Sequence, residues 1–297
     1  MSHSVAFLGL GAIGAPMAAR LAAAGHALTI WNRTAGRASA SEAAAGGARV
    51  APSATAAIAA ADVVITCLPE SRDVAALLDE TALDAFRAGS ILVDCTSGDP
   101  ATSRVIAQRL AARDVAFVDA PVSGGVVGAV AGTLTVMVGG ESAHLERVRP
   151  ILEAFAGKIV HCGAIGAGHA LKAVNNALLA LHVWSTAEAL ATAQAAGVDP
   201  AITLDVINAS SGRSNASMNL FPERVLTGAF PRTFRLALLD KDARIAAGIA
   251  RDAALPAPTL QLAADLMAVA HRELGEEADH VEAVRVVERW MRTELRG

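Results

Sequence analysis

The stretch Ser4-Val-Ala-Phe-Leu-Gly9-Leu-Gly11-Ala12-Ile13-Gly14 decides the fold. Its first five residues are a short apolar run, typical of a buried strand, and the run ends at a glycine. An alanine-rich stretch over residues 15–24 follows, with two larger apolar side chains at helical spacing. The order of strand, tight turn and helix predicts the start of a parallel sheet with crossover helices.

The three glycines of this stretch each have a mechanical role in a nucleotide-binding loop. One makes the tight turn, one lets the backbone approach a pyrophosphate, and one allows the helix to pack on the strand. The helix N-terminus offers free N–H groups and the positive end of its dipole to phosphates. An ordinary alanine-rich helix start is the alternative. The position between strand and helix favours a dinucleotide site, with Gly9, Gly11, Ala12, Ile13 and Gly14 in contact with the cofactor.

The residues after the second expected strand, 27–31, indicate which dinucleotide binds. An NAD site usually has an acidic residue there to accept from the ribose 2′-hydroxyl, whereas this chain has Asn32-Arg33-Thr34. Arg33 can form charge-assisted bonds to a 2′-phosphate, with Thr34 and Arg37 assisting. The alternative is that both arginines are solvated loop charges. We expect NADP to be preferred over NAD.

Further apolar runs alternate with helical stretches through the first half of the chain. Strands are expected at residues 62–67, 91–94, 116–119 and 134–138, and helices at 74–83 and 101–112. This alternation predicts an α/β fold with a parallel sheet covered by helices on both faces.

Ligands of such sheets lie beyond the carboxyl ends of the strands. The residues in these places are Leu68, Pro69, Thr96 and the run Ser123-Gly124-Gly125. A serine hydroxyl followed by two glycines offers donors without steric cover, which suits a carboxylate or a phosphate. A flexible turn is the alternative for this run.

The second half of the chain is helix-compatible from Gly168 onwards. A long helix is expected over residues 168–195, and shorter ones at 201–208, 236–249, 260–274 and 281–295. We therefore predict two domains, a dinucleotide-binding domain of residues 1–163 and an all-helical substrate and oligomerisation domain of residues 164–297, linked by the long helix.

Lys172 is the one formally charged residue between Lys158 and Glu188. A lone ammonium on a largely apolar helix is costly unless something polar meets it, although a lysine can also extend to solvent. Asn176 lies four residues on and shares its helix face, while Asn175 lies on a neighbouring stripe. Lysine and asparagine on one face form a pair of donors.

Composition excludes several functions. The 297 residues carry a net charge of −4 and no tyrosine, so neither a basic stripe nor a set of stacking aromatics supports nucleic-acid binding. Three scattered cysteines indicate no disulfide framework, hence a reducing, cytoplasmic compartment. The first residues lack the basic charge of a signal peptide, and no apolar stretch reaches membrane-spanning length. We expect neither a metal site nor a membrane partner.

Hydride transfer between a nicotinamide and a carbonyl or alcohol needs a group that exchanges a proton with the oxygen. The absence of tyrosine excludes the Tyr/Lys arrangement of short-chain dehydrogenases, and no HExxH, paired cysteines or histidine cluster supports a zinc alcohol dehydrogenase. Lys172 is the best candidate for the proton donor.

Four motifs resemble those of the β-hydroxyacid dehydrogenase family, typified by 3-hydroxyisobutyrate dehydrogenase. They are the glycine loop, Asp119-Ala-Pro-Val-Ser123-Gly124-Gly125, Gly166-Ala-Gly168-His-Ala-Leu-Lys172-Ala-Val-Asn175-Asn176 and Leu239-Asp-Lys241-Asp242. The resemblance covers essentially the whole chain and implies a Rossmann-type sheet domain followed by a helical domain.

The resemblance also implies roles for single residues. Lys172 is the catalytic acid and base, Asn176 fixes the substrate with Asn175 beside it, and Ser123, Gly124 and Gly125 hold the substrate carboxylate. Leu68, Pro69, Thr96 and Lys241 contact the cofactor, and Asp242 supports the lysine region. Without the resemblance, Lys241 and Asp242 would be interpreted as a surface ion pair.

The expected reaction is hydride transfer between NAD(P) and a small 3-hydroxy acid or its semialdehyde. Asn32-Arg33-Thr34 is similar to the NADPH-dependent branch of the family, which extends to imine reductases. Those enzymes generally replace the lysine, so Lys172 favours a carbonyl or alcohol substrate. An imine reductase and a non-catalytic dinucleotide-binding scaffold remain alternatives. The resemblance implies a homodimer or homotetramer. Arg213, Ser214 and Phe234 are pocket candidates with no assigned role.

Overall fold

The computed structural model describes residues 3–39 and 41–297. The chain forms two compact units, of which the first ends at Lys172 and the second is Ala173–Gly297. The division falls inside helix α10 (Ala167–Ala195), after its first turns, whereas we placed the boundary at 163/164. The start of α10 packs within the first unit because its backbone is held there by Asp119, as described below.

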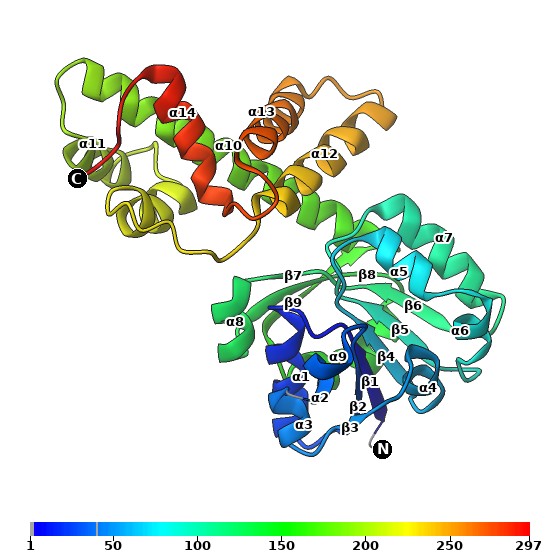
Figure 1. Ribbon diagram of the computed structural model, residues 1–297. Helices are drawn as coiled ribbons and strands as arrows, with labels where there is room; N and C mark the ends of the chain where they lie inside the picture. Colours follow the sequence, from blue (N-terminus) through cyan, green and yellow to red (C-terminus); the bar gives the residue numbers. More distant parts are fainter. Residues whose placement is uncertain (1–2, 40) are drawn as a thin grey trace. The chain divides into compact units, whose positions relative to one another are not determined.

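The first unit is built on one twisted sheet (Figure 1). Its strand order is β3-β2-β1-β4-β5-β6-β8-β7, and β9 pairs with β8. The chain winds outward in one direction from β1 to β3 and in the other from β4 to β6, so the switch point lies between β1 and β4. The strands are β1 (Ser4–Leu8), β2 (Ala27–Trp31), β3 (Arg49–Val50), β4 (Val63–Thr66), β5 (Ile91–Asp94), β6 (Ala116–Asp119), β7 (Val122–Ser123), β8 (Leu134–Gly139) and β9 (Ala156–Gly163).

The predicted α/β fold with a Rossmann-type sheet is confirmed, and the expectation of a parallel sheet is wrong at one edge. The strands β3, β2, β1, β4, β5 and β6, in their order across the sheet, are parallel to one another. Strand β8 runs antiparallel to β6, and β7 runs antiparallel to β8. Strands β6 and β7 follow each other closely in the chain, and β8 returns between them in the opposite direction, so it pairs antiparallel with both. We did not predict β3, β7 or β9. The first two have two residues each, and β9 carries Lys158 and His161.

Helices cover both faces of the sheet, because alternate strand residues face opposite sides. In β1, Val5 and Phe7 belong to one buried cluster, and Ala6 and Leu8 belong to another. The first cluster includes residues of α1 (Gly14–Ala23), α3 (Glu42–Ala45), α8 (Gly125–Ala131) and α9 (Ser142–Leu152). The second includes residues of α4 (Ala54–Ala59), α5 (Ser71–Leu77), α6 (Glu80–Asp84) and α7 (Pro100–Ala111). Helix α2 is Ala35–Ser39.

The single helix that we expected over residues 74–83 is wrong, because the structure has two helices there. Residues 74–83 form parts of α5 and α6 because Asp79 breaks the run. Its backbone is extended, and its carboxylate accepts from the N–H of Ala82 at 2.8 Å, which starts a new helix.

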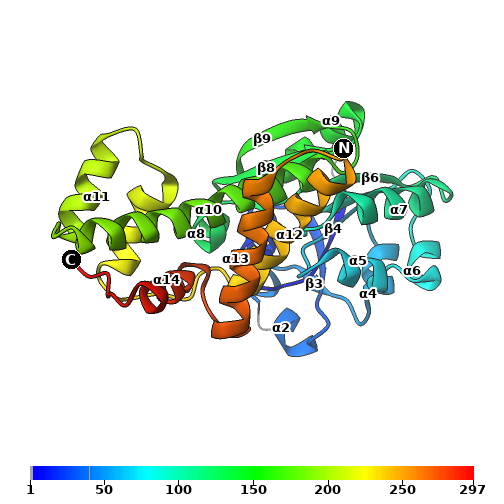
Figure 2. The ribbon, with the colours of Figure 1, turned by 90° about the horizontal axis from the view of Figure 1, so that it is seen from above.

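The second unit is helical. It contains the rest of α10 and α11 (Pro200–Ala209), a π-helix η1 (Ala216–Val225), α12 (Leu236–Asp252), α13 (Pro258–Leu274), the 3₁₀ turn η2 (His280–Ala283) and α14 (Val284–Met291). Helices α12 and α13 lie side by side in both views (Figures 1 and 2). The last expected helix, 281–295, ends early because Arg292 adopts a left-handed conformation with φ of 53°. The π-helix was not predicted.

The core of the helical unit is one buried cluster. Trp184 of α10 meets Trp290 of α14 edge to face, with ring centroids 5.4 Å apart. Phe221 of η1 and Leu239 of α12 are fully buried in the same cluster. Among the described residues, no helix is both long and apolar enough to span a bilayer.

Candidate functional site

The glycine loop follows β1 at the switch point of the sheet. Gly9 has φ of +108°, and an added Cβ would lie 2.4 Å from the carbonyl oxygen of Cys67. At Gly14 an added Cβ would lie 2.1 Å from the carbonyl oxygen of Gly9. The fold itself therefore requires glycine at both positions.

Gly11 differs from these two glycines, because no described protein atom lies within 4 Å of the Cβ that another residue would add. Its φ is not positive either. Helix α1 begins after Ile13 without a side-chain cap in the described part of the chain. Open space beside uncapped helix N–H groups fits the pyrophosphate of a dinucleotide. The residues present therefore fit the cofactor.

Of the three residues after β2, Asn32 has a structural role, and Arg33 and Thr34 are exposed. The Oδ1 atom of Asn32 accepts from the N–H of Leu10 at 2.9 Å, and its Nδ2 atom donates to the carbonyl of Thr34 at 3.1 Å. Asn32 therefore ties the glycine loop to the turn. Arg33 and Thr34 are the residues of this run with exposed side chains, and Arg37 of the following turn is exposed as they are.

A buried polar network joins the ends of β4 and β5. The hydroxyl of Thr66 donates to Oδ1 of Asp94 at 2.8 Å, and the N–H of Thr96 donates to the same oxygen at 3.1 Å. The Thr96 hydroxyl accepts from the N–H of Leu68 at 3.0 Å. Thr96 and Asp94 are each 1% exposed, while Pro69 is exposed. The network thus fixes the two loops that carry the predicted cofactor residues, Leu68 and Pro69 after β4 and Thr96 after β5.

The predicted carboxylate-binding run lies at the end of β7. Ser123 pairs with Thr135 of β8 and is half-buried. Gly124 and Gly125 are exposed and have φ of +133° and +64°. These backbone conformations need glycine, so the alternative of a simple turn explains the glycines as well as a ligand does.

The start of α10 is held by a carboxylate that sequence reasoning left without a role. Asp119, at the end of β6, is fully buried and accepts from the N–H of Gly166 at 2.6 Å and from that of His169 at 2.9 Å. An added Cβ at Gly168 would lie 2.2 Å from the carbonyl oxygen of Met137. The Gly-x-Gly motif therefore allows the helix start to approach the sheet closely.

Lys172 is the sixth residue of α10, is half-buried and ends the first unit. His169, three residues earlier, is fully buried and contacts Ser103 of α7. Neither His169 nor Ser103 was predicted to have a role. A histidine within an apolar helix start, like the lone lysine, was the available signal.

The remaining predicted polar residues form a chain of contacts in the helical unit. Asn175 donates to Oδ1 of Asn176 at 3.2 Å, and Asn176 donates to Oδ2 of Asp242 at 2.6 Å. Lys241 lies 2.9 Å from the other Asp242 oxygen. The interpretation of Lys241 and Asp242 as a surface pair is wrong, because their side chains are 12% and 2% exposed.

Two of the unassigned candidates are explained by helix and turn geometry. Ser214 exchanges backbone and hydroxyl bonds with Ser217 at the start of η1. The N–H of Phe234 donates to Asp279 at 2.8 Å, and its ring packs edge to face on His280. Arg213 is exposed.

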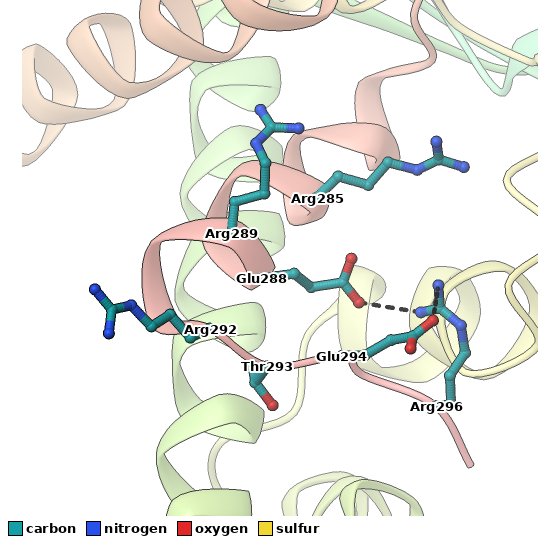
Figure 3. Close-up of a pocket in the computed structure, with 7 residues that line it drawn as sticks. All are labelled: Arg285, Glu288, Arg289, Arg292, Thr293, Glu294 and Arg296. Carbon is teal, nitrogen blue, oxygen red and sulfur yellow. Dashed lines mark hydrogen bonds and ion pairs between the residues drawn. The ribbon is translucent and has the colours of Figure 1, made fainter.

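A pocket in the helical unit contains none of the predicted residues (Figure 3). Its charged side chains are largely paired, since Arg296 contacts Glu288 and Glu294, and Arg289 contacts Glu273. The contact of Arg296 with Glu288 joins the last residues of the chain to α14. The C-terminus lies near α11 in Figure 1. The lining residues are Arg285, Glu288, Arg289, Arg292, Thr293, Glu294 and Arg296.

The cysteines are poorly suited to nucleophilic chemistry. Burial, with the nearby Asp94 carboxylate, raises the pKa of Cys67 to about 12, and burial also raises the pKa of Cys95 and of Cys162. In the described part of the chain, no group of three or more His, Cys, Asp or Glu could hold a metal ion.

The doubly wound sheet and its glycine loop define a dinucleotide-binding protein with a helical second unit. Residues 4–163 match the family model of the NAD binding domain of 6-phosphogluconate dehydrogenase. Residues 166–287 match a second family model, which is described as the NAD-binding domain of NADP-dependent 3-hydroxyisobutyrate dehydrogenase. The chain belongs to the β-hydroxyacid dehydrogenase family, which confirms the resemblance drawn from its motifs.

Individual relatives cover most of the chain. It is 38% identical over 278 residues to 3-hydroxyisobutyrate dehydrogenase of Pseudomonas aeruginosa, covering 89% of this chain and 91% of that protein. It is 42% identical over 210 residues to an NAD-dependent L-serine dehydrogenase of the same organism, covering 70% of each. A solved structure of Mycobacterium tuberculosis 3-hydroxyisobutyrate dehydrogenase with L-serine has a TM-score of 0.89, 36% identity and coverage of 97% and 99%.

Proposed function

We propose that this protein transfers a hydride between NADP and a small 3-hydroxy acid or its semialdehyde. The observation that carries the proposal is the glycine loop at the switch point, with open space at Gly11, on the same compact unit as Lys172. A nicotinamide bound there would accept or supply the hydride. Family membership and relatives named 3-hydroxyisobutyrate dehydrogenase and L-serine dehydrogenase support the substrate class.

The chain's own residues bind the substrate and move its proton. Lys172 gives a proton to the carbonyl oxygen in reduction and takes it from the alcohol in oxidation. Ser123 and the N–H groups of Gly124 and Gly125 bind the substrate carboxylate, and Asn176, with Asn175, binds its polar groups. A lysine in this role favours a carbonyl or an alcohol over an imine.

The preference for NADP rests on Arg33. Its exposed guanidinium makes no hydrogen bond or ion pair with another described residue, whereas the Asn32 side chain is bonded within the loop. The second matched family model, that of NADP-dependent 3-hydroxyisobutyrate dehydrogenase, agrees with this preference. The L-serine dehydrogenase, in contrast, is NAD-dependent. We also propose a cytoplasmic homodimer or homotetramer, on the resemblance to the family.

The deciding experiment is an initial-rate screen of small hydroxy acids and semialdehydes with NADP(H) and NAD(H) in parallel. We expect turnover of a 3-hydroxy acid, faster with the phosphorylated cofactor. Fluorescence titration with NADPH in the absence of substrate separates binding from turnover. Binding without turnover of any member of the panel would instead favour the scaffold alternative.

Lys172→Ala tests the proton-transfer role. We expect kcat to fall at least about 100-fold, because general acid–base catalysis typically contributes about 10² to 10⁴. The affinity for NADPH should stay nearly unchanged. Lys158→Ala, at an exposed position of β9, is the matched control and should keep full activity. A Lys172→Ala enzyme with normal kcat would eliminate the lysine as the acid.

A further inference from the structure

Thr135 of β8 lies beside the proposed carboxylate site and has no role so far. It pairs directly with Ser123 of β7 in the antiparallel ladder, so the two side chains lie on the same face of the sheet. Directly opposed residues of this kind have Cβ atoms about 4.5–5.5 Å apart. Both residues are half-buried, and Gly124 and Gly125 follow directly. Two hydroxyls thus lie side by side at the end of β7.

Neither hydroxyl is used inside the protein. Among the described residues, Oγ of Ser123 and Oγ1 of Thr135 make no hydrogen bond. Neither oxygen is one of the buried polar atoms that lack a partner, so both are open to solvent. Each hydroxyl therefore keeps its proton for a ligand or for water. The place of the pair on the sheet distinguishes these two cases.

The two hydroxyls lie on the face of the sheet where α10 begins. Val136 belongs to the buried cluster that includes α1 and α8, so its neighbours Thr135 and Met137 point to the opposite face. Asp119 points to that opposite face too, since Val118 before it belongs to the first cluster. The Asp119 carboxylate accepts from the N–H groups at the start of α10, so the helix starts on this face.

Successive close contacts give the direction in which the start of α10 runs along β8. An added Cβ at Gly139 would lie 2.8 Å from the carbonyl oxygen of Ala164. Four residues later in the chain, an added Cβ at Gly168 would lie 2.2 Å from the carbonyl oxygen of Met137. The contact thus moves along β8 from Gly139 to Met137, which is the direction of Thr135.

The position of Lys172 follows from these contacts. Lys172 comes four residues after Gly168, which is about 6 Å along a helix. Thr135 comes two residues before Met137, which is about 6.6 Å along a strand. Because the two advances match, Lys172 reaches the level of Thr135 on the same face. Lys172, Thr135 and Ser123 are therefore grouped within the first unit.

We propose that Thr135 binds the substrate carboxylate together with Ser123. A carboxylate has two oxygens that only accept, and two neighbouring hydroxyls can donate to both of them. Hydrogen bonds to a charged acceptor are stronger than those between neutral groups, so the site selects a free acid over its ester or amide. The inference rests on the proposed function, because it extends the substrate site assigned there.

Four variants separate a ligand contact from a structural role. Thr135→Val removes the hydroxyl and keeps a β-branched side chain in the strand. Thr135→Ser keeps the hydroxyl. Thr29→Val, in β2, is the matched control for the loss of a strand threonine. Lys158→Ala removes the exposed cation that pairs with Thr135 on its other side.

The first measurement needs no turnover and uses propanoate as the probe, a carboxylate without a hydroxyl group. Its binding to NADPH-saturated protein is followed by ¹H relaxation of the probe. Thr135→Val should raise the Kd of propanoate about 10- to 100-fold, the effect of losing one hydrogen bond to a charged group. The other three variants should change this Kd less than about threefold, since they keep both hydroxyls.

Three results of this titration would overturn the proposal. They are an unchanged Kd in Thr135→Val, an equal loss in Lys158→Ala, and a wild-type protein that does not bind propanoate. Thermal unfolding of Thr135→Val should match that of Thr29→Val, because the hydroxyl has no partner inside the described chain.

The second measurement is kinetic and uses the hydroxy acid that the wild type turns over. Thr135→Val should raise its KM about 10- to 100-fold, with kcat and the NADPH Kd changed less than about threefold. A fall in kcat at constant KM would assign the hydroxyl to Lys172 instead and would refute carboxylate binding. If the wild type turns over no hydroxy acid, the proposed function fails, while the propanoate titration still decides the role of Thr135.

Discussion

At the scale of single residues, the glycines of the first loop divide into those that the fold needs and one that it does not. Gly11→Ala should fold as well as the wild type, since the added methyl meets no described protein atom. It should weaken NADPH binding at least about tenfold, because the methyl enters the space proposed for the pyrophosphate. Thermal unfolding and fluorescence titration measure the two effects.

Gly14→Ala is the matched comparison for this prediction. Its methyl would lie 2.1 Å from the carbonyl oxygen of Gly9, so we expect a loss of stability of roughly 1–3 kcal/mol or more. Unchanged NADPH affinity in a folded Gly11→Ala protein would argue against this loop as the phosphate site.

Arg33 is the residue on which cofactor choice depends. Arg33→Ala should raise the Kd for NADPH about 10- to 100-fold, because hydrogen bonds between charged groups contribute about 1.5–3 kcal/mol. The Kd for NADH should change less than about twofold, since NADH has no 2′-phosphate. Arg251→Ala, at an exposed arginine of α12, controls for the change in net charge. Equal losses for both cofactors would refute the assignment.

At the scale of elements, the first turn of α10 depends on a residue far away in the sequence. Asp119→Ala would leave the N–H groups of Gly166 and His169 without their acceptor in a buried place. At roughly 1–3 kcal/mol for each unsatisfied group, we expect a loss of roughly 2–6 kcal/mol in urea unfolding followed by circular dichroism.

Asp79→Ala provides the comparison for Asp119, because Asp79 caps α6 in a similar way. Loss of a cap near the surface costs typically about 1 kcal/mol. Equal effects of the two substitutions would mean that burial of the Asp119 bonds adds nothing, contrary to our expectation.

The elements that were predicted well are those whose signal is local. Ser4–Leu8, Ala27–Trp31 and Ile91–Asp94 are apolar runs between polar or glycine residues, and the structure has strands with these bounds. Strand β9 was missed because its alternation is interrupted by charge, and it forms only where β8 offers a free edge. The direction of β8 follows from tertiary packing, which no local pattern encodes.

In the candidate site, too, the features with a local sequence signal could be predicted, and the contacts between distant residues could not. The glycine loop and Lys172 stand out in the sequence, because their residue types are costly or unusual where they occur. The contacts of Asp119 with Gly166 and of Asp94 with His169 join residues 47 and 75 positions apart. Pairing at such separations depends on strand order, so the sequence alone could not identify these partners.

At the scale of the whole molecule, each unit has its own buried core, and the helical unit carries a carboxylate that links its stability to pH. Burial opposes ionisation of Asp279, but His280 and the N–H groups of Phe234 and Thr233 outweigh burial, and its pKa lies well below the usual 3.8. A depressed pKa stabilises the folded state above about pH 4, and this contribution is lost as the pH falls further through the folded pKa.

The helical unit should therefore unfold in acid, and Asp279→Asn should make its stability lower at pH 7 but less dependent on pH below 4. Two of the three tryptophans, Trp184 and Trp290, lie in this unit, so Trp31→Phe gives a protein whose fluorescence reports on it alone. Urea unfolding of this protein, with and without Asp279→Asn, is measured between pH 7 and pH 2. Because the asparagine cannot take up the proton that acid adds to Asp279, parallel pH curves for the two proteins would show that another group controls the acid transition.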